Sequence, residues 1–142
     1  MQPLIETHAD VADGLERLYN GLRRLTPREG LSLTAASTLK RLARSGPQRL
    51  TELYAAEGVT QPAMTQLVTR LEKDGLAERC GDPADGRVVL VAITDAGREV
   101  VEGRRRRFAA ALDEVLQRLP AEDRAAIVAA LPAMERLGDA IN

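Results

Sequence analysis

The sequence contains few of the residues that build disulfides, metal sites and aromatic cores. Its 142 residues include one cysteine, Cys80, and one histidine, His8. This set can form neither an internal disulfide nor a zinc site with soft ligands, so disulfide scaffolds and zinc fingers are excluded. Tryptophan is absent, and two tyrosines and one phenylalanine are the only aromatic residues. A core built from Leu, Val, Ile, Ala and Met suits helix packing better than a β-sandwich.

Patterns that mark enzymes and membrane proteins are also missing. There is no G-x-S-x-G, P-loop or G-x-G-x-x-G motif, and the histidine and the cysteine lie far apart in the sequence. No apolar stretch approaches the roughly 18 to 20 residues of a membrane span, and the first residues lack the features of a signal peptide. We therefore expect one cytoplasmic domain that is not an enzyme, needs no metal or cofactor, and does not bind membranes.

Charge is distributed unevenly along the chain, although the net charge is only −1. Residues 17–49 hold eight arginines and lysines against a single acid, Glu29, whereas residues 1–16 and 108–142 sum to −4 and −3. Such a basic segment is either a solvated surface or a binding surface for an anionic polymer such as nucleic acid.

Apolar periodicity predicts four helices in the first half of the chain. A stripe from Val11 to Leu25, in steps of three and four residues, predicts the first helix. The expected N-caps of the next three helices are Thr34, Thr51 and Thr60. The glycines expected to end them are Gly46, Gly58 and Gly75.

The period then changes to that of β-structure. Residues 77–80 and 88–93 are short β-prone runs, and the turn formers of residues 81–87 join them, which predicts a hairpin. After the hairpin, Thr94 is expected to cap a long helix that runs to about Leu119. A last helix should begin near Ala121, with Pro132 marking a kink or break within it.

This order of elements predicts a mainly α fold with a small β-hairpin, a winged helix-turn-helix. We expect residues 34–94 to form the DNA-binding lobe and residues 4–26 and 95–142 to form terminal dimerisation helices. Their apolar stripes have no evident partner in so small a lobe, and a second copy of the chain would bury them.

Five short motifs in a fixed order carry a resemblance to a known family. They are Leu50–Leu53, Val59–Thr65, Val68–Leu76, Asp82–Arg87 and Ile93–Gly97. At this spacing, and from about Leu15 to Ala140, the chain resembles the MarR family of bacterial transcriptional regulators. The resemblance implies a homodimer that binds a pseudo-palindromic operator in double-stranded DNA. Such proteins are usually repressors of nearby genes, released by a small-molecule effector or by oxidation.

The fourth helix carries the residues expected to read DNA. Its polar side holds glutamine, threonine and arginine, which can pair with adenine, contact the thymine methyl group, and read guanine or hold phosphate, respectively. The polar side of this helix and the family resemblance together predict which of its residues contact DNA. They are Thr60, Gln61, Pro62, Thr65, Gln66, Thr69, Arg70 and Lys73. Arg49 and Thr51, at the start of the preceding helix, complete the expected DNA-contacting set.

Two further residues come from the wing. The resemblance implies that Arg87 enters the minor groove, whose negative potential attracts arginine, and that Asp85 orients it. A surface ion pair at a hairpin tip is the alternative interpretation.

Other functions remain open for the same fold. A winged helix can bind protein, or can act as an architectural DNA-binding module without an effector. Cys80 is either a small buried apolar residue or a redox-sensitive thiol.

Overall fold

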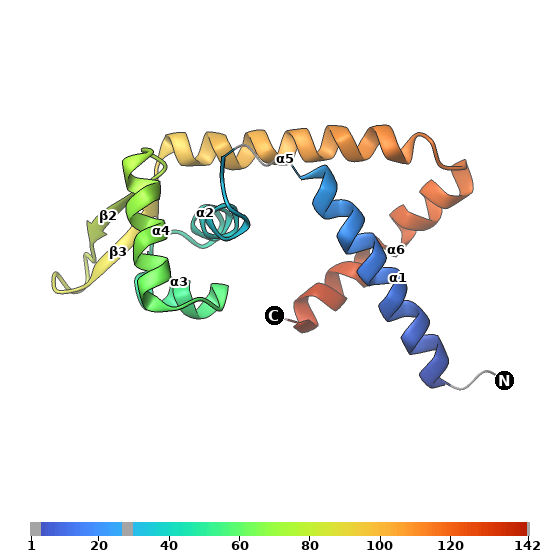
Figure 1. Cartoon of the computed structure of the whole chain (residues 1–142), viewed down its shortest axis with the longest axis horizontal. Coiled ribbons are helices and arrows are strands. Elements are labelled where there is room, and N and C mark those ends of the chain that lie inside the picture. The colour runs from blue at the N-terminus through green and yellow to red at the C-terminus, as the bar shows by residue number, and fades with distance from the viewer. Residues whose placement is uncertain (1–3, 27–29, 142) are drawn as a thin grey trace. The chain divides into compact units, whose positions relative to one another are not determined.

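The computed structural model describes residues 4–26 and 30–141, and Figure 1 shows the order of its elements. The elements are α1 (Leu4–Leu25), α2 (Leu33–Ser45), β1 (Gln48–Arg49), α3 (Leu50–Glu57), α4 (Gln61–Lys73), β2 (Ala77–Gly81), β3 (Val89–Ile93), α5 (Asp95–Leu116) and α6 (Ala121–Ile141). No helix within the described ranges is long and apolar enough to span a membrane.

The chain divides into two compact units. Met1–Leu25 and Phe108–Asn142 form one, which contains α1, the end of α5 and α6. We call it the terminal unit. Thr26–Arg107 forms the other, which contains α2 to α4, the three strands and the start of α5, and which we call the lobe.

The lobe has its own apolar core. Its three strands form an antiparallel sheet in the order β1-β3-β2, and the tip of the β2–β3 hairpin projects away from the helices (Figure 1). The largest fully buried apolar side chains on the helices and the sheet are Leu39, Leu42, Leu53, Met64, Val68, Leu71 and Val91. Each such side chain contributes about 1.5–3 kcal/mol of transfer free energy. This arrangement is the predicted winged helix.

Two of the predicted helix caps are wrong. Ser32, not Thr34, caps α2: its backbone is extended and its side chain accepts from the backbone N–H of Ala35 at 3.1 Å. The N-cap of α3 is Arg49 rather than Thr51, and the side chain of Glu52 accepts from the Arg49 N–H at 2.9 Å. A cap needs an extended backbone just before the helix, and both threonines already lie inside one.

The other two predicted caps are correct. The Thr60 hydroxyl accepts from the backbone N–H of Ala63 at 3.3 Å at the start of α4. The Thr94 hydroxyl accepts from the N–H of Gly97 at 3.1 Å at the start of α5.

The sheet contains one strand more than predicted. The hairpin itself is confirmed, with β2 paired to β3 from Ala77↔Ile93 to Gly81↔Val89. β1 pairs on the other side of β3 through Gln48↔Val91 and Arg49↔Leu90. Two residues show no alternation, so a strand this short leaves no pattern in the sequence.

The last two helices also differ in detail from the prediction. α5 ends at Leu116 rather than near Leu119, because the N–H groups of Arg118 and Leu119 bond three residues back, to the carbonyls of Val115 at 3.1 Å and Leu116 at 3.0 Å. Of the predicted kink or break at Pro132, the break does not occur, because α6 continues through Pro132 to Ile141. No described residue of α6 is buried, so water can reach the carbonyl that the proline leaves without a donor.

A close contact joins the wing to the start of α5. A Cβ atom on Gly97 would lie 2.2 Å from the carbonyl oxygen of Leu76 and 2.7 Å from Cγ1 of Ile93. Thr94 donates to the carbonyl of Gly75 at 2.6 Å. The end of α4, the exit of β3 and the first turn of α5 therefore meet at a position that only glycine fits.

Candidate nucleic-acid interface

Helix α4 presents a polar surface over the core. Met64, Val68 and Leu71 are buried beneath it. All predicted DNA-contacting residues of α4 and its cap are exposed except Thr65, which is half-buried. This two-sided helix results from apolar residues at spacings of three and four, which leave the remaining positions to solvent.

The residues predicted before α4 lie on a separate element of the lobe. Arg49 and Thr51 are both exposed, where β1 passes into α3. Their side chains are thus accessible, and α3 itself is anchored by the fully buried Leu53.

An ion pair links α4 to the wing strand β2. Arg79 forms a salt bridge with Glu72, whose carboxylate is the only acidic side chain of α4. The other terminal nitrogen of Arg79, Nη2, donates to the Thr69 hydroxyl at 3.4 Å. Arg79 therefore neutralises a negative charge on the helix and connects the helix to the hairpin. No local pattern in the sequence marks Arg79, and only the packing of β2 beside α4 reveals it.

The wing loop is held by its own aspartates. The Asp82 carboxylate accepts from the N–H of Ala84 at 2.8 Å, and the loop is closed by a bond from the Asp82 N–H to the Val88 carbonyl at 3.0 Å. Asp85 accepts from the backbone N–H of Arg87 at 3.1 Å. The contact between this pair thus runs through the Arg87 backbone. No ion pair to the Arg87 guanidinium occurs among the described residues.

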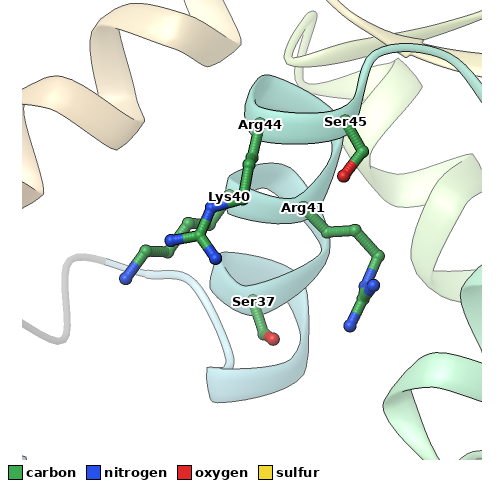
Figure 2. A pocket seen from close by; sticks show the side chains of 5 residues that line it. All are labelled: Ser37, Lys40, Arg41, Arg44 and Ser45. Carbon is green, nitrogen blue, oxygen red and sulfur yellow. The ribbon is translucent and has the colours of Figure 1, made fainter. Parts of the chain in front are cut away.

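Helix α2 carries a basic hollow of about 210 Å³ that the sequence analysis did not single out. Its lining residues are Ser37, Lys40, Arg41, Arg44 and Ser45. Figure 2 shows Lys40 and Arg44 extending to one side of the helix and Arg41 to the other. These residues are three or four apart, so they start from neighbouring positions on α2 before their side chains diverge. This spacing is the signal that could have found the hollow.

Glu57 of α3 fixes one wall of this basic hollow. It accepts from the Ser37 hydroxyl at 2.9 Å and lies 3.6 Å from Nε of Arg41. The Glu57 side chain is only 10% exposed, so the pair is partly shielded from water. The remaining cations, Lys40 and Arg44, are exposed.

Comparisons with known proteins agree with a DNA-binding role for the exposed side of α4. The MarR family matches residues 31–89 of the chain. An HTH-type transcriptional regulator of Mycobacterium tuberculosis is 35% identical over 98 residues, which cover 69% of this chain and 68% of the relative.

Solved structures show the same fold over nearly the whole chain. A transcriptional regulator from Thermotoga maritima superimposes with a TM-score of 0.78 at 27% identity, covering 92% of this chain and 95% of that one. The Bordetella bronchiseptica protein BpsR, whose DNA binding is regulated by 6-hydroxynicotinic acid, gives a TM-score of 0.59 at 27% identity, covering 89% and 98%.

Proposed function

The chain belongs to the MarR family of transcriptional regulators, and we propose that it acts as a homodimeric repressor on a pseudo-palindromic operator in double-stranded DNA. The observation that carries the proposal is the exposed polar side of α4, which stands on a fully buried apolar row beside a projecting hairpin. This combination suits a helix that enters the major groove with a wing alongside it. As a regulator of transcription, the protein would work in the cytoplasm and catalyse no reaction.

The exposed apolar residues of the terminal unit support the homodimer. Large apolar side chains of its helices are exposed in the single chain: Val11, Leu18, Tyr19, Val115, Ile127, Val128, Leu131, Met134, Leu137 and Ile141. Exposed apolar surface on this scale marks an interaction site, and a closed two-fold pairing would bury the same surface on both copies. The pairing would also present two α4 helices to DNA.

In this proposal each predicted residue contacts the part of DNA that suits its side chain. Gln61, Gln66 and Arg70 would contact base edges, whereas Arg49 and Lys73 would contact phosphates. Arg87 would enter the minor groove from the wing.

Footprinting and salt titration test DNA binding directly. We expect protection of two half-sites whose centres are about 10 bp apart, and an affinity that falls steeply with salt as bound counterions are released. A protein that binds a protein partner instead would protect no DNA. An architectural module would protect DNA without preference for one promoter.

Release of the operator by an acidic small molecule is the second part of the proposal. BpsR responds to a carboxylic acid, and the basic hollow on α2 offers exposed cations and hydroxyl groups to such a ligand. Arg44→Ala should then abolish the thermal shift that a binding carboxylate produces, with Arg98→Ala, a cation outside the hollow, as the control.

Oxidation is the alternative signal, acting on the half-buried Cys80 of β2. It predicts that peroxide lowers operator affinity in the parent protein and not in Cys80→Ser.

A further inference from the structure

Two threonines on the outer side of α4 have already used their hydroxyl hydrogens. Thr65 Oγ1 lies 2.9 Å from the carbonyl oxygen of Gln61, and Thr69 Oγ1 lies 2.8 Å from that of Thr65. A carbonyl oxygen can only accept, so each hydroxyl must be the donor in its bond. Neither threonine therefore has a hydrogen to donate to a base.

The acceptor capacity of the two hydroxyls differs. A hydroxyl oxygen has two lone pairs, and Arg79 Nη2 donates to one of them on Thr69 Oγ1 at 3.4 Å. Thr69 therefore keeps one acceptor position, whereas Thr65 Oγ1 receives no side-chain donor within the described ranges. Towards a ligand, each threonine offers a methyl group and an acceptor, but no donor.

These two sets of groups fit one kind of base pair. The major-groove edge of guanine displays only acceptors, N7 and O6, and needs a donor that neither threonine has. An A·T pair displays the N6 donor of adenine and the C5 methyl group of thymine. A G·C pair displays the N4 donor of cytosine but no methyl group. Only the A·T pair matches both the acceptor and the methyl group that each threonine offers.

We propose that Thr65 and Thr69 select A·T pairs at two positions of each half-site by contact with thymine methyl groups. Arg79 acts as a positioning residue that holds the Thr69 side chain. This inference rests on the proposed entry of α4 into the major groove. Four residues advance a helix by about 6 Å. The two positions therefore lie about two base pairs apart, at about 3.4 Å per step along a strand.

The test removes the methyl groups from the DNA and from the protein in turn. An operator is selected from a random duplex library with the parent protein, and each thymine in a half-site is then replaced singly by uracil, which lacks the C5 methyl group. Two positions should each lose about fourfold in affinity, the effect of one buried methyl group. Thr69→Ser should abolish the loss at one position, and Thr65→Ser the loss at the other.

Matched variants separate the methyl group from the hydroxyl. Thr69→Val keeps the methyl group and removes the hydroxyl, so the roughly fourfold difference between thymine and uracil at the Thr69 position should remain. Arg79→Gln should reduce the difference between thymine and uracil at the Thr69 position and leave the Thr65 position unchanged. A purely structural role of Arg79 would weaken binding to both DNAs equally.

The outcomes distinguish this inference from the function it rests on. If no sequence is enriched from the library, the proposed operator binding is wrong, and the base preference with it. An enriched operator that binds equally well with uracil, or that places guanine at these positions, overturns the inference alone. Loss of the difference between thymine and uracil in Thr69→Val would do so as well, because that variant keeps the methyl group.

Discussion

The lobe and the terminal unit use similar apolar residues in opposite ways. In the lobe, Leu39, Leu42 and Leu53 are completely buried within the same chain. In the terminal unit, Leu131 is 50% exposed and Ile141 is 76% exposed. The lobe thus has a core of its own, whereas the terminal helices would bury their apolar side chains only in the proposed dimer. The stability of the terminal unit should therefore vary with protein concentration, and that of the lobe should not.

The largest effect is expected from a charge placed in the exposed apolar stripe of α6, because it should abolish the dimer that the terminal unit is proposed to form. Leu131→Asp would put a carboxylate into the proposed dimer contact, where its desolvation is costly. Light scattering should then give a monomer mass. Operator affinity should fall by about 100-fold or more, because the two half-sites no longer act together.

The control lies on the opposite side of the same helix. Ala129→Asp adds the same charge about half a turn away from Leu131 and should remain dimeric. A dimer of unchanged stability in Leu131→Asp would show that the stripe is not the contact.

Gly97→Ala tests the stability of the lobe instead. The added methyl group would collide with the Leu76 carbonyl at 2.2 Å, and backbone atoms cannot move aside cheaply. The free energy of unfolding should fall by about 3 kcal/mol, at the upper end of overpacking effects. Urea denaturation followed by circular dichroism measures it.

Gly81→Ala in β2 serves as its control within the lobe, since an added Cβ meets nothing within 4 Å there. In a strand this change should stabilise by up to about 0.5–1 kcal/mol. Equal stability of the two variants would contradict the close contact at Gly97.

A substitution on the exposed side of α4 should alter operator binding while leaving the stability of both units unchanged. Arg70→Ala should cost about 1–3 kcal/mol of operator binding and relax base preference, if its contact is bidentate to a base. Gln66→Ala should act similarly. The unfolding curve should be unchanged, since both side chains are exposed. A uniform loss on all sequences would instead assign Arg70 to phosphate.

The smallest effect is expected in the wing. Arg87→Ala should weaken binding to operators with A·T-rich flanks more than to operators with G·C-rich flanks, because a narrow minor groove attracts arginine more strongly. Asp85→Ala should reproduce part of this loss, since the Asp85 carboxylate fixes the Arg87 backbone N–H. Fluorescence anisotropy on both operators measures it. Parent-like binding of Arg87→Ala to both would make the wing a structural hairpin only.

The sequence predicted what depends on local pattern. The apolar spacing of α4, the Thr60 and Thr94 caps and the β2–β3 hairpin each follow from neighbouring residues, and the structure confirms them. Where two hydroxyl residues compete, as Ser32 and Thr34 do for α2, the choice depends on backbone angles that the sequence does not display.

Long-range features could not be predicted in this way. The bond from Arg79 to Thr69 requires β2 to lie beside α4, and the link between Ser37 and Glu57 requires α2 to pack on α3. The exposed polar residues of α4 could be named in advance because burial of one side of a helix leaves the other to solvent. Which of their hydrogens remain available could not, because that depends on rotamers.

The wing loop has a kinetic consequence. Residues 81–87 carry two carboxylates, of Asp82 and Asp85, and one guanidinium, of Arg87, so the loop is negative overall. A negative loop does not accelerate diffusion towards a polyanion, and the arginines and lysines elsewhere on the lobe must provide electrostatic steering. Because the bonds of Asp82 and Asp85 already order the loop, little entropy is lost when it docks. The wing should therefore affect how long the complex lasts and leave the rate of its formation unchanged.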